Sequence, residues 1–414
     1  MKKSLKNVLR KDRVANLSYR VLTIVFKFLL SIIIVKNLSV HDLGVYGIFQ
    51  TTITLLIYIL GFDFYTFNTR EILREEKNIS FLLLNQVAFH AIVYILILPL
   101  ILLLFSYNVI STEYIVYFYV ILVVEHTSQE IYRILITLKR SVIASLSLFL
   151  RSGIWIFILY VAWTYNLSSG TITDIFSLWF IGALISIIVG LFGIGFKTSI
   201  EIPFKIDFDW IKKGIKVAAP FFLATVFYKI IEFSGRFFLD YYWTKEDVGI
   251  FTFFSGISNA MFVFVQSTVI IVLSPYLIES ANKGFKEFRK VFNNYRQQIL
   301  LTTSIGFSLA ALAIYPLLLF VDNELLLNNV LIFFVLLLAV AFFCFSYIPH
   351  YGLYSFHRDK SLLKASIIGA VVNVLFNFVL VPNYGVLGAA IAQAISMCSL
   401  FITKEIFFKK FKNE

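Results

Sequence analysis

The feature that most constrains this chain is a succession of apolar runs, each long enough to cross a lipid bilayer. A spanning helix needs about 20 predominantly apolar residues. Twelve such spans are expected, at 14–35, 45–65, 82–105, 114–136, 146–163, 174–195, 217–240, 248–273, 298–320, 329–349, 362–381 and 385–407. Charged residues make up only 14% of the 414 residues, against about 25% in soluble domains. The sequence therefore excludes a water-soluble protein and predicts an all-α integral membrane protein.

The lysines and arginines predict how these spans are oriented. With the N-terminus inside, thirty of the 36 basic residues fall in the termini and in the inside connections, whereas Lys36 and Lys245 alone lie outside. Basic residues accumulate on the cytoplasmic side, so we expect an N-in/C-in topology. Contact with anionic lipid headgroups then accounts for the net charge of +12, and nucleic acid is not expected as a partner.

Two inside connections are expected to lie at the membrane surface. In 282–298, aromatic residues recur at helical spacing with lysine and arginine among them, which is typical of a surface helix. The other connection, 202–211, places Trp210 near the headgroups.

No catalytic or cofactor motif is evident in the sequence. Cys344 and Cys398 fall inside apolar runs, so a disulfide framework is not expected, and metal-ligand spacings are missing. A P-loop and a glycine-rich nucleotide turn are also missing. We therefore expect no cofactor, no resident metal and no catalytic residues, and we expect that the protein is not an enzyme.

An internal repeat predicts how the spans are grouped. The run Asp42-Leu43-Gly44-Val45-Tyr46 matches Asp247-Val248-Gly249-Ile250-Phe251 at an offset of 205, close to half the length. We expect two six-helix bundles, at 1–200 and 215–414, joined by a cytoplasmic linker at 201–214. Six spans is an even number, so the bundles should be related by a pseudo-two-fold axis along the membrane normal, which is a common transporter plan.

Four of the 36 basic residues are counted neither with the termini nor with a connection and are assigned to the interior of predicted spans, where a charge costs about 2.5–3.5 kcal/mol. They are Lys27, Arg151, Lys229 and Arg236. In span seven, Lys229, Glu232, Arg236 and Asp240 share one helix face. This face is either a ladder of internal ion pairs or the polar wall of a cavity that binds an anion, and the two are compatible. Lys27 has no acidic residue three or four positions away.

Carboxylates inside the spans are candidates for binding a coupling ion, H⁺ or Na⁺. They are Glu125, Glu130, Glu232 and Asp240. The alternative for Glu125 is an ion pair with Arg151 or Lys27. Arg151 lies about one turn into span five, so snorkelling to the inner interface is the favoured interpretation. His90 and His350 are expected to be packed or interfacial rather than ligands.

Three segments carry a resemblance to a known family. They are Leu43-Gly44-Val45-Tyr46-Gly47-Ile48-Phe49, Gly249-Ile250-Phe251, and Asn373 and Asn377 followed by Val381-Pro382-Asn383-Tyr384-Gly385-Val386-Leu387-Gly388-Ala389-Ala390. The last resembles the junction between the final two spans of Wzx-type polysaccharide (O-antigen) flippases. These belong to the multidrug/oligosaccharidyl-lipid/polysaccharide exporter superfamily. Pro382 and Gly385 are expected to form a tight turn, and the small residues after it to allow close helix packing.

The resemblance implies a V-shaped transporter with alternating access in the bacterial cytoplasmic (inner) membrane. Its cargo would be an undecaprenyl-pyrophosphate-linked oligosaccharide, moved from the cytoplasmic to the outer leaflet for O-antigen, lipopolysaccharide or capsule synthesis. A cationic central cavity would bind this anionic cargo, with Lys27, Lys229, Arg236 and Arg151 as candidates. Further partners implied are membrane lipids, a coupling H⁺ or Na⁺, a polysaccharide polymerase and a chain-length regulator.

Two other functions stay open. A multidrug or metabolite exporter of the same superfamily would more often carry an acidic cavity, against which the basic candidates argue. A membrane-embedded oligosaccharide polymerase or glycosyltransferase would need a sizeable outer loop with catalytic side chains, whereas the predicted outer connections are short.

Overall fold

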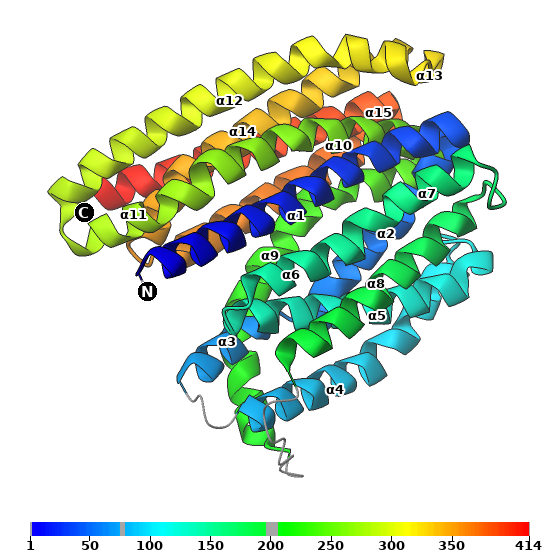
Figure 1. Ribbon diagram of the computed structural model, residues 1–414. Helices are drawn as coiled ribbons and strands as arrows, with labels where there is room; N and C mark the ends of the chain where they lie inside the picture. Colours follow the sequence, from blue (N-terminus) through cyan, green and yellow to red (C-terminus); the bar gives the residue numbers. More distant parts are fainter. Residues whose placement is uncertain (1, 75–78, 196–205, 414) are drawn as a thin grey trace. The chain divides into compact units, whose positions relative to one another are not determined.

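The protein is all-helical, and its helices are joined by short connections (Figure 1). The computed structural model describes residues 2–74, 79–195 and 206–413. The chain forms two compact units. Unit 1 comprises Met1–Ile33 and Phe49–Phe222, and unit 2 comprises Ile34–Ile48 and Leu223–Glu414. The bundle boundaries expected from the sequence stay a prediction; 201–205 of the expected linker lies outside the described residues, and Phe208 already begins a helix.

Three helices contribute to both units along the chain: α1 (Lys2–Asn37), α2 (Val40–Gly61) and α9 (Phe208–Tyr242). The other helical segments of unit 1 are α3 (Tyr65–Arg74), α4 (Ile79–Ser106), η2 (Thr112–Tyr114), α5 (Ile115–Thr137), α6 (Ser141–Phe149), the π-helical turn η3 (Leu150–Ile154), α7 (Trp155–Thr164) and α8 (Ile172–Ile194). Those of unit 2 are α10 (Lys245–Val265), the π-helical turn η4 (Gln266–Ile270), α11 (Ile271–Asn282), α12 (Phe285–Val321), α13 (Glu324–Asn328), α14 (Val330–Tyr354) and α15 (Asp359–Asn413).

Within the described residues, ten helices are long and apolar enough to cross a membrane. The charged helix α5 is not among them, although it coincides with predicted span four. Helix α15 coincides with predicted spans eleven and twelve, because Gly385 breaks it with a non-helical conformation at φ 53°. The chain is thus a multi-pass membrane protein, while the count of twelve spans and their orientation stay predictions.

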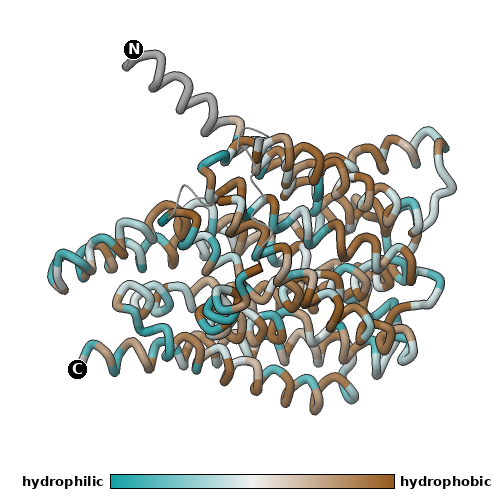
Figure 2. The backbone as a smooth tube through the Cα atoms, turned by 90° about the horizontal axis from the view of Figure 1, so that it is seen from below, coloured by the Kyte–Doolittle hydropathy of each residue, from teal (hydrophilic) through white to brown (hydrophobic). Residues whose placement is uncertain are grey.

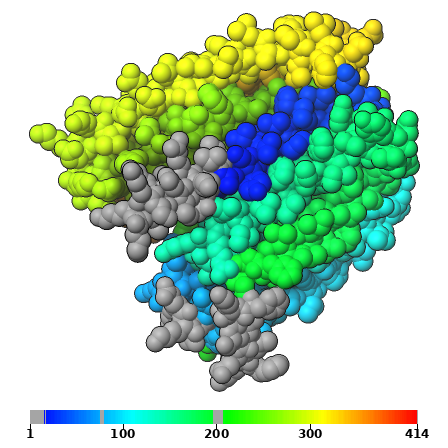
Figure 3. All heavy atoms as spheres, viewed as in Figure 1, coloured from blue at the N-terminus to red at the C-terminus, as the bar shows by residue number. Residues whose placement is uncertain are grey.

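Apolar side chains cover the outside of both units, as contact with lipid requires. In unit 1, Ile95 of α4 is 74% exposed, and in unit 2, Leu312 of α12 is 75% exposed. Figure 2 shows hydrophobic residues along most of the helical path. The yellow side chains of α12 cover one face of unit 2 in Figure 3. Such exposed apolar surface is unstable in water, so these faces are expected to contact acyl chains.

The expected surface helix at 282–298 is wrong. Asn282 ends α11, and residues 285–298 form the first turns of α12, which continues without a break to Val321. Phe288 and Tyr295 are completely buried, and Phe288 packs on Phe356 with ring centroids 4.8 Å apart. Aromatic residues at helical spacing suit a surface helix and a buried helix face equally well, and here they belong to the core of unit 2.

The two copies of the internal repeat, at the starts of α2 and α10, contact each other reciprocally, and both starts belong to unit 2. A Cβ atom added to Gly44 would lie 1.7 Å from the carbonyl oxygen of Lys245, and one added to Gly249 would lie 2.0 Å from that of Val40. Gly44 thus contacts Lys245, four positions before Gly249, and Gly249 contacts Val40, four positions before Gly44. Such a reciprocal contact is what a local two-fold relation between the repeats produces.

Candidate functional site

Helix α5 carries a polar stripe through the otherwise apolar core of unit 1. Glu125, His126 and Glu130 are all less than 9% exposed. Their side chains separate into two groups, which we name the Glu125 cluster (Glu125, Arg151, Trp179 and Lys27) and the Glu130 cluster (Glu130, Arg133, His90, His126 and Gln86). Each buried charge in lipid needs a partner or a ligand, so these clusters are the first candidates for function.

Glu125 and Arg151 form a buried ion pair across two helical segments. Arg151 Nε lies 3.5 Å from Glu125 Oε1, and Trp179 Nε1 donates to Glu125 Oε2 over 3.3 Å. Arg151 is only 7% exposed, so the favoured expectation that it snorkels is wrong, and the alternative pairing with Glu125 is confirmed. Arg151 lies in the π-helical turn η3, a distortion that is frequent at functional sites.

The Glu125 cluster has more positive than negative charge. Arg151 Nη1 is buried without a hydrogen-bond partner among the described residues. Lys27 on α1 is exposed, and the charges of both Arg151 and Glu125 act on it. Two cations against one carboxylate leave a net charge of +1, which is the electrostatic condition for holding an anion.

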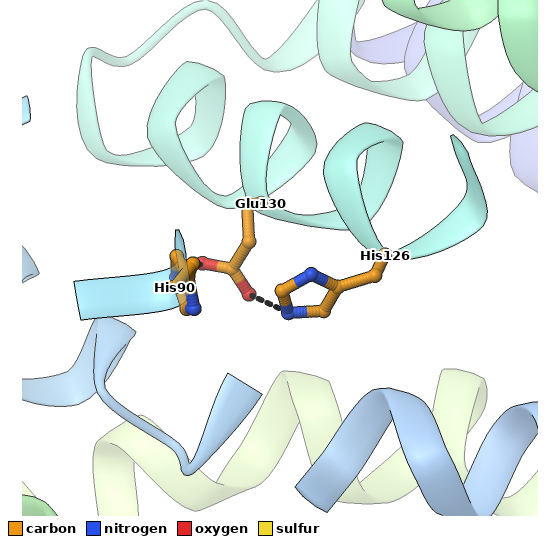
Figure 4. Close-up of side chains that lie close together, drawn as sticks. All are labelled: His90, His126 and Glu130. Atoms are coloured by element: carbon orange, nitrogen blue, oxygen red, sulfur yellow. Dashed lines mark ion pairs between the residues drawn. The ribbon is translucent and has the colours of Figure 1, made fainter. Parts of the chain in front are cut away.

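The Glu130 cluster joins α4 and α5 through a single carboxylate. Arg133 Nη1 donates to Glu130 Oε1 over 2.5 Å, and Gln86 Nε2 donates to Oε2 over 2.8 Å. His90 Nε2 lies 3.6 Å from Oε2, and His126 Nε2 lies 3.9 Å from Oε1. Figure 4 shows the His126 ring directed at one oxygen of the Glu130 carboxylate and His90, seen edge-on, beside the carboxylate. The guanidinium of Arg133 also lies 3.9 Å from the ring centroid of Tyr65.

His90 is a residue of this site that sequence reasoning missed. It was expected to be packed or interfacial, and it is indeed buried, with its ring against Phe89, but the same ring also faces the Glu130 carboxylate. The spacing of Gln86, His90 and Tyr94, four residues apart in an otherwise apolar span, is the signal that could have found it. The donor atoms of His90, His126 and Glu130 lie within 4.8 Å of one another, close enough for one small cation.

In unit 2 the charged face of α9 is only partly an internal ladder. Lys229 Nζ lies 2.6 Å from Glu232 Oε2, as the ladder predicts. Asp240 instead pairs with Lys245 at the start of α10. Arg236 donates to the hydroxyls of Thr252, over 3.2 Å, and Ser255, over 2.7 Å. The ladder is therefore confirmed for its first pair and wrong for Arg236 and Asp240.

Arg236 and Lys404 are buried cations that form no ion pair among the described residues. Arg236 is 9% exposed and lies between the rings of Phe233 and Phe251. Lys404 is 5% exposed, and its Nζ lies 3.4 Å from Ser346 Oγ. Lys404 is one of the thirty basic residues counted from the sequence in the termini and inside connections, but it is buried in unit 2. Its position in the last turn of an expected span was the available signal.

The asparagine and glycine motif of α15 is structural. Asn373 and Asn377 are completely buried, and both contact Ser234 of α9. A Cβ atom at Gly388 would lie 2.3 Å from Leu380 O, so the segment after Gly385 packs closely on the segment before it. The tight turn expected here is confirmed at Gly385. The motif therefore shapes unit 2.

Comparisons with known proteins identify both the family and the fold. The family described as polysaccharide biosynthesis protein matches residues 9–281. A multidrug resistance MATE family transporter of the MOP superfamily, solved inward-facing, superposes with a TM-score of 0.78 at 15% identity, over 96% of this chain and 97% of that one. The lipid II flippase MurJ, in an inward closed conformation, gives 0.73 at 15% identity, over 96% and 87%. No curated protein sequence matches the chain.

Proposed function

Because the chain belongs to the polysaccharide biosynthesis protein family, we propose that it is a flippase for undecaprenyl-pyrophosphate-linked oligosaccharide repeat units. It carries them from the cytoplasmic to the outer leaflet of a bacterial inner membrane by alternating access. The MOP-type transporter fold supports this function, and one of the similar structures is itself named as a lipid II flippase.

The observation that carries the proposal is Arg236, a buried guanidinium held by two hydroxyl groups. The hydroxyls accept from two of its nitrogens but carry no charge, and a diphosphate is the ligand whose geometry and charge complement a guanidinium best. Lys229 on the same helix face and Lys27 with Arg151 in unit 1 extend this cationic character. We assign these four residues to the binding of the anionic cargo.

The carboxylates are assigned to ion coupling within the same proposal. Glu125 and Glu130 are buried and each pairs with an arginine, so release of either pair would expose a cation site. Glu232 pairs with Lys229, which couples a carboxylate directly to a proposed cargo residue. Asp240 pairs with Lys245 and is the weakest of the four candidates.

The experiment that tests the function is complementation of a deletion strain. Wild type should restore surface glycan, whereas Arg236→Ala, Lys229→Ala and Lys27→Ala should reach the membrane but leave lipid-linked repeat units on the inner leaflet. Lys216→Ala, which removes an exposed lysine from the same helix α9, is the matched control and should export normally. Normal glycan in all three cargo variants would contradict the cationic site.

Two alternatives give different results in the same strain. If repeat units reach the outer leaflet but stay unpolymerised, the protein is a polymerase or glycosyltransferase. If the glycan is unchanged but resistance to organic cations falls, it is a multidrug or metabolite exporter.

A further inference from the structure

The hydrogen bond between the His90 ring and Leu60 favours the neutral form in which the other ring nitrogen, Nε2, carries no hydrogen. Its Nδ1 lies 3.3 Å from the carbonyl oxygen of Leu60. A carbonyl oxygen only accepts hydrogen bonds, so Nδ1 carries the hydrogen and Nε2 carries a lone pair. That lone pair faces Glu130 Oε2 at 3.6 Å. Two buried lone pairs that face each other repel. With a neutral His90 ring in this tautomer, a proton or another cation is therefore missing between His90 Nε2 and Glu130 Oε2.

His126 satisfies the same carboxylate in a different way. Its Nδ1 lies 2.6 Å from the hydroxyl oxygen of Tyr94. When that hydroxyl donates to Nδ1, Nε2 of a neutral ring carries the hydrogen and points it at Glu130 Oε1, 3.9 Å away. Among the residues that the structure describes, neither His90 Nε2 nor His126 Nε2 has a hydrogen-bond partner, and both are buried.

Glu130 has room for two more donors. A carboxylate offers about four lone-pair positions, and Arg133 and Gln86 fill one on each oxygen. The two that remain face the two unpartnered imidazole nitrogens (Figure 4). His126 supplies its N–H without a change of charge, but His90 supplies one and keeps its hydrogen bond to Leu60 O only by gaining a proton. The carboxylate is therefore fully hydrogen-bonded when His90 is an imidazolium.

The balance of buried charge selects one proton over a metal ion. Glu130 and Asp63 are negative and buried, and Arg133, on which both act, is positive, which leaves a net charge of −1. The other titratable groups around them, Tyr58 and Tyr65 from α2 and α3 and Tyr94 from α4, are neutral phenols. For Glu130, Arg133 and Asp63 taken together, one proton brings the summed charge to zero, whereas a divalent ion would leave +1 in an apolar bundle, which is costly.

We propose that His90, Glu130 and His126 form a binding site for one exchangeable proton, carried on His90 Nε2 and shared with the Glu130 carboxylate. Arg133 and Gln86 hold the carboxylate in place, and Tyr94 sets the tautomer of His126. Resting on the proposed function, this site also names the coupling ion: it is H⁺ rather than Na⁺, because the acceptor that lacks a partner is an imidazole nitrogen, which Na⁺ binds poorly.

The test observes the imidazole nitrogens directly, without cargo. Full-length protein labelled with ¹⁵N-histidine is placed in lipid nanodiscs and titrated by NMR over about pH 4 to 9; the chain has five histidines, which single substitutions assign. His90 should change from a neutral ring protonated on Nδ1 to an imidazolium as the pH falls. His126 should stay neutral with its proton on Nε2.

Glu130→Gln should lower the proton affinity of His90 by about 10- to 1,000-fold, because the opposing charge is lost. Glu125→Gln, a buried carboxylate on the same helix with a different arginine partner, is the matched control and should leave the titration of His90 in place. If Glu130→Gln does not fold, Tyr94→Phe serves instead: His126 should lose its single tautomer while His90 still titrates.

A His90 that stays neutral throughout, or that titrates equally in Glu130→Gln, would overturn the proposal. So would tight binding of one equivalent of Zn²⁺, added alone in a calorimetric titration and lost in His90→Gln. A protein that fails to export glycan but shows the expected titration would refute the proposed function and leave the proton site intact.

Discussion

The Glu125–Arg151 pair allows a structural role to be separated from a role in cargo binding. At 3.5 Å, the Coulomb attraction between the two charges is about 5 kcal/mol at an effective dielectric constant of about 20. Desolvation of both groups offsets most of this, but removal of one partner leaves a buried charge unpaired. We therefore expect Arg151→Met or Glu125→Gln alone to lower the free energy of unfolding by about 3–5 kcal/mol.

The double variant Glu125→Gln/Arg151→Met should recover most of this loss, because neither buried charge remains. Glutamine still accepts the hydrogen bond from Trp179. The assay is unfolding of purified protein by SDS in mixed micelles, with all four members of the cycle compared. Glu279 and Lys283 are a matched control pair: their atoms are 2.6 Å apart, but both side chains are more than 60% exposed, so their coupling should be close to zero.

Export in the same four strains then decides the role of Arg151. If Arg151 only neutralises Glu125, the double variant regains both stability and surface glycan. If it also binds the anionic cargo, as we propose, stability returns and export does not. Single-variant costs that simply add would refute the ion pair as the dominant interaction, and a double variant with normal glycan would refute the cargo role.

Three further predictions concern the other basic residues. Arg236→Lys should lose most of its export, because an ammonium group cannot bind a diphosphate through two parallel hydrogen bonds; lipid-linked units on the inner leaflet report this, and full activity would mean that charge alone suffices. Lys404→Met should raise stability towards SDS, because it removes a buried cation whose Nζ lies 3.4 Å from Ser346 Oγ; a large loss of stability would reveal an anionic partner. A single cysteine at position 140 should react with an impermeant thiol reagent only after the membrane is opened, and labelling of intact cells would overturn the N-in/C-in topology.

The parts of the fold that follow from local sequence were predictable. The apolar runs correspond to the helices, and the glycine-containing junction does turn at Gly385. The matching runs after Asp42 and Asp247 both begin helices whose first turns are capped, by Ser39 and Thr244 respectively. Spacing and composition predict these helices, the turn and the caps because each of them depends on residues that are close together in the sequence.

The parts that depend on which helix faces which were not predictable from one sequence. Arg151 lies one turn into its span, and depth alone does not tell whether its side chain reaches a headgroup or Glu125. His90 has no charged residue near it in the sequence, and Glu130, its partner, is 40 positions away. The aromatic stripe of 282–298 has the same period whether it faces lipid or Phe356. In each case tertiary packing selects between two locally equivalent states.

The reciprocal glycines give a last prediction, which tests the internal repeat as a packing unit. A Cβ atom essentially never lies closer than 3.0 Å to another heavy atom, so the contacts of 1.7 and 2.0 Å require shifts of about 1 Å at Gly44 and Gly249. The opposing atoms are backbone oxygens, which no rotamer change can move, so the starts of α2 and α10 must separate. We expect either alanine variant to cost about 3 kcal/mol, at the upper end of overpacking.

Because both glycines serve the same crossing, the first substitution already separates the helices, and the second should cost much less. Gly306→Ala is the control: its nearest neighbour is the flexible Met261 side chain at 3.0 Å, so its effect should be small. SDS unfolding of the two single variants and the double variant measures this. Costs that add would mean that the glycines act at independent contacts, and the matching runs would then share a sequence without sharing an interface.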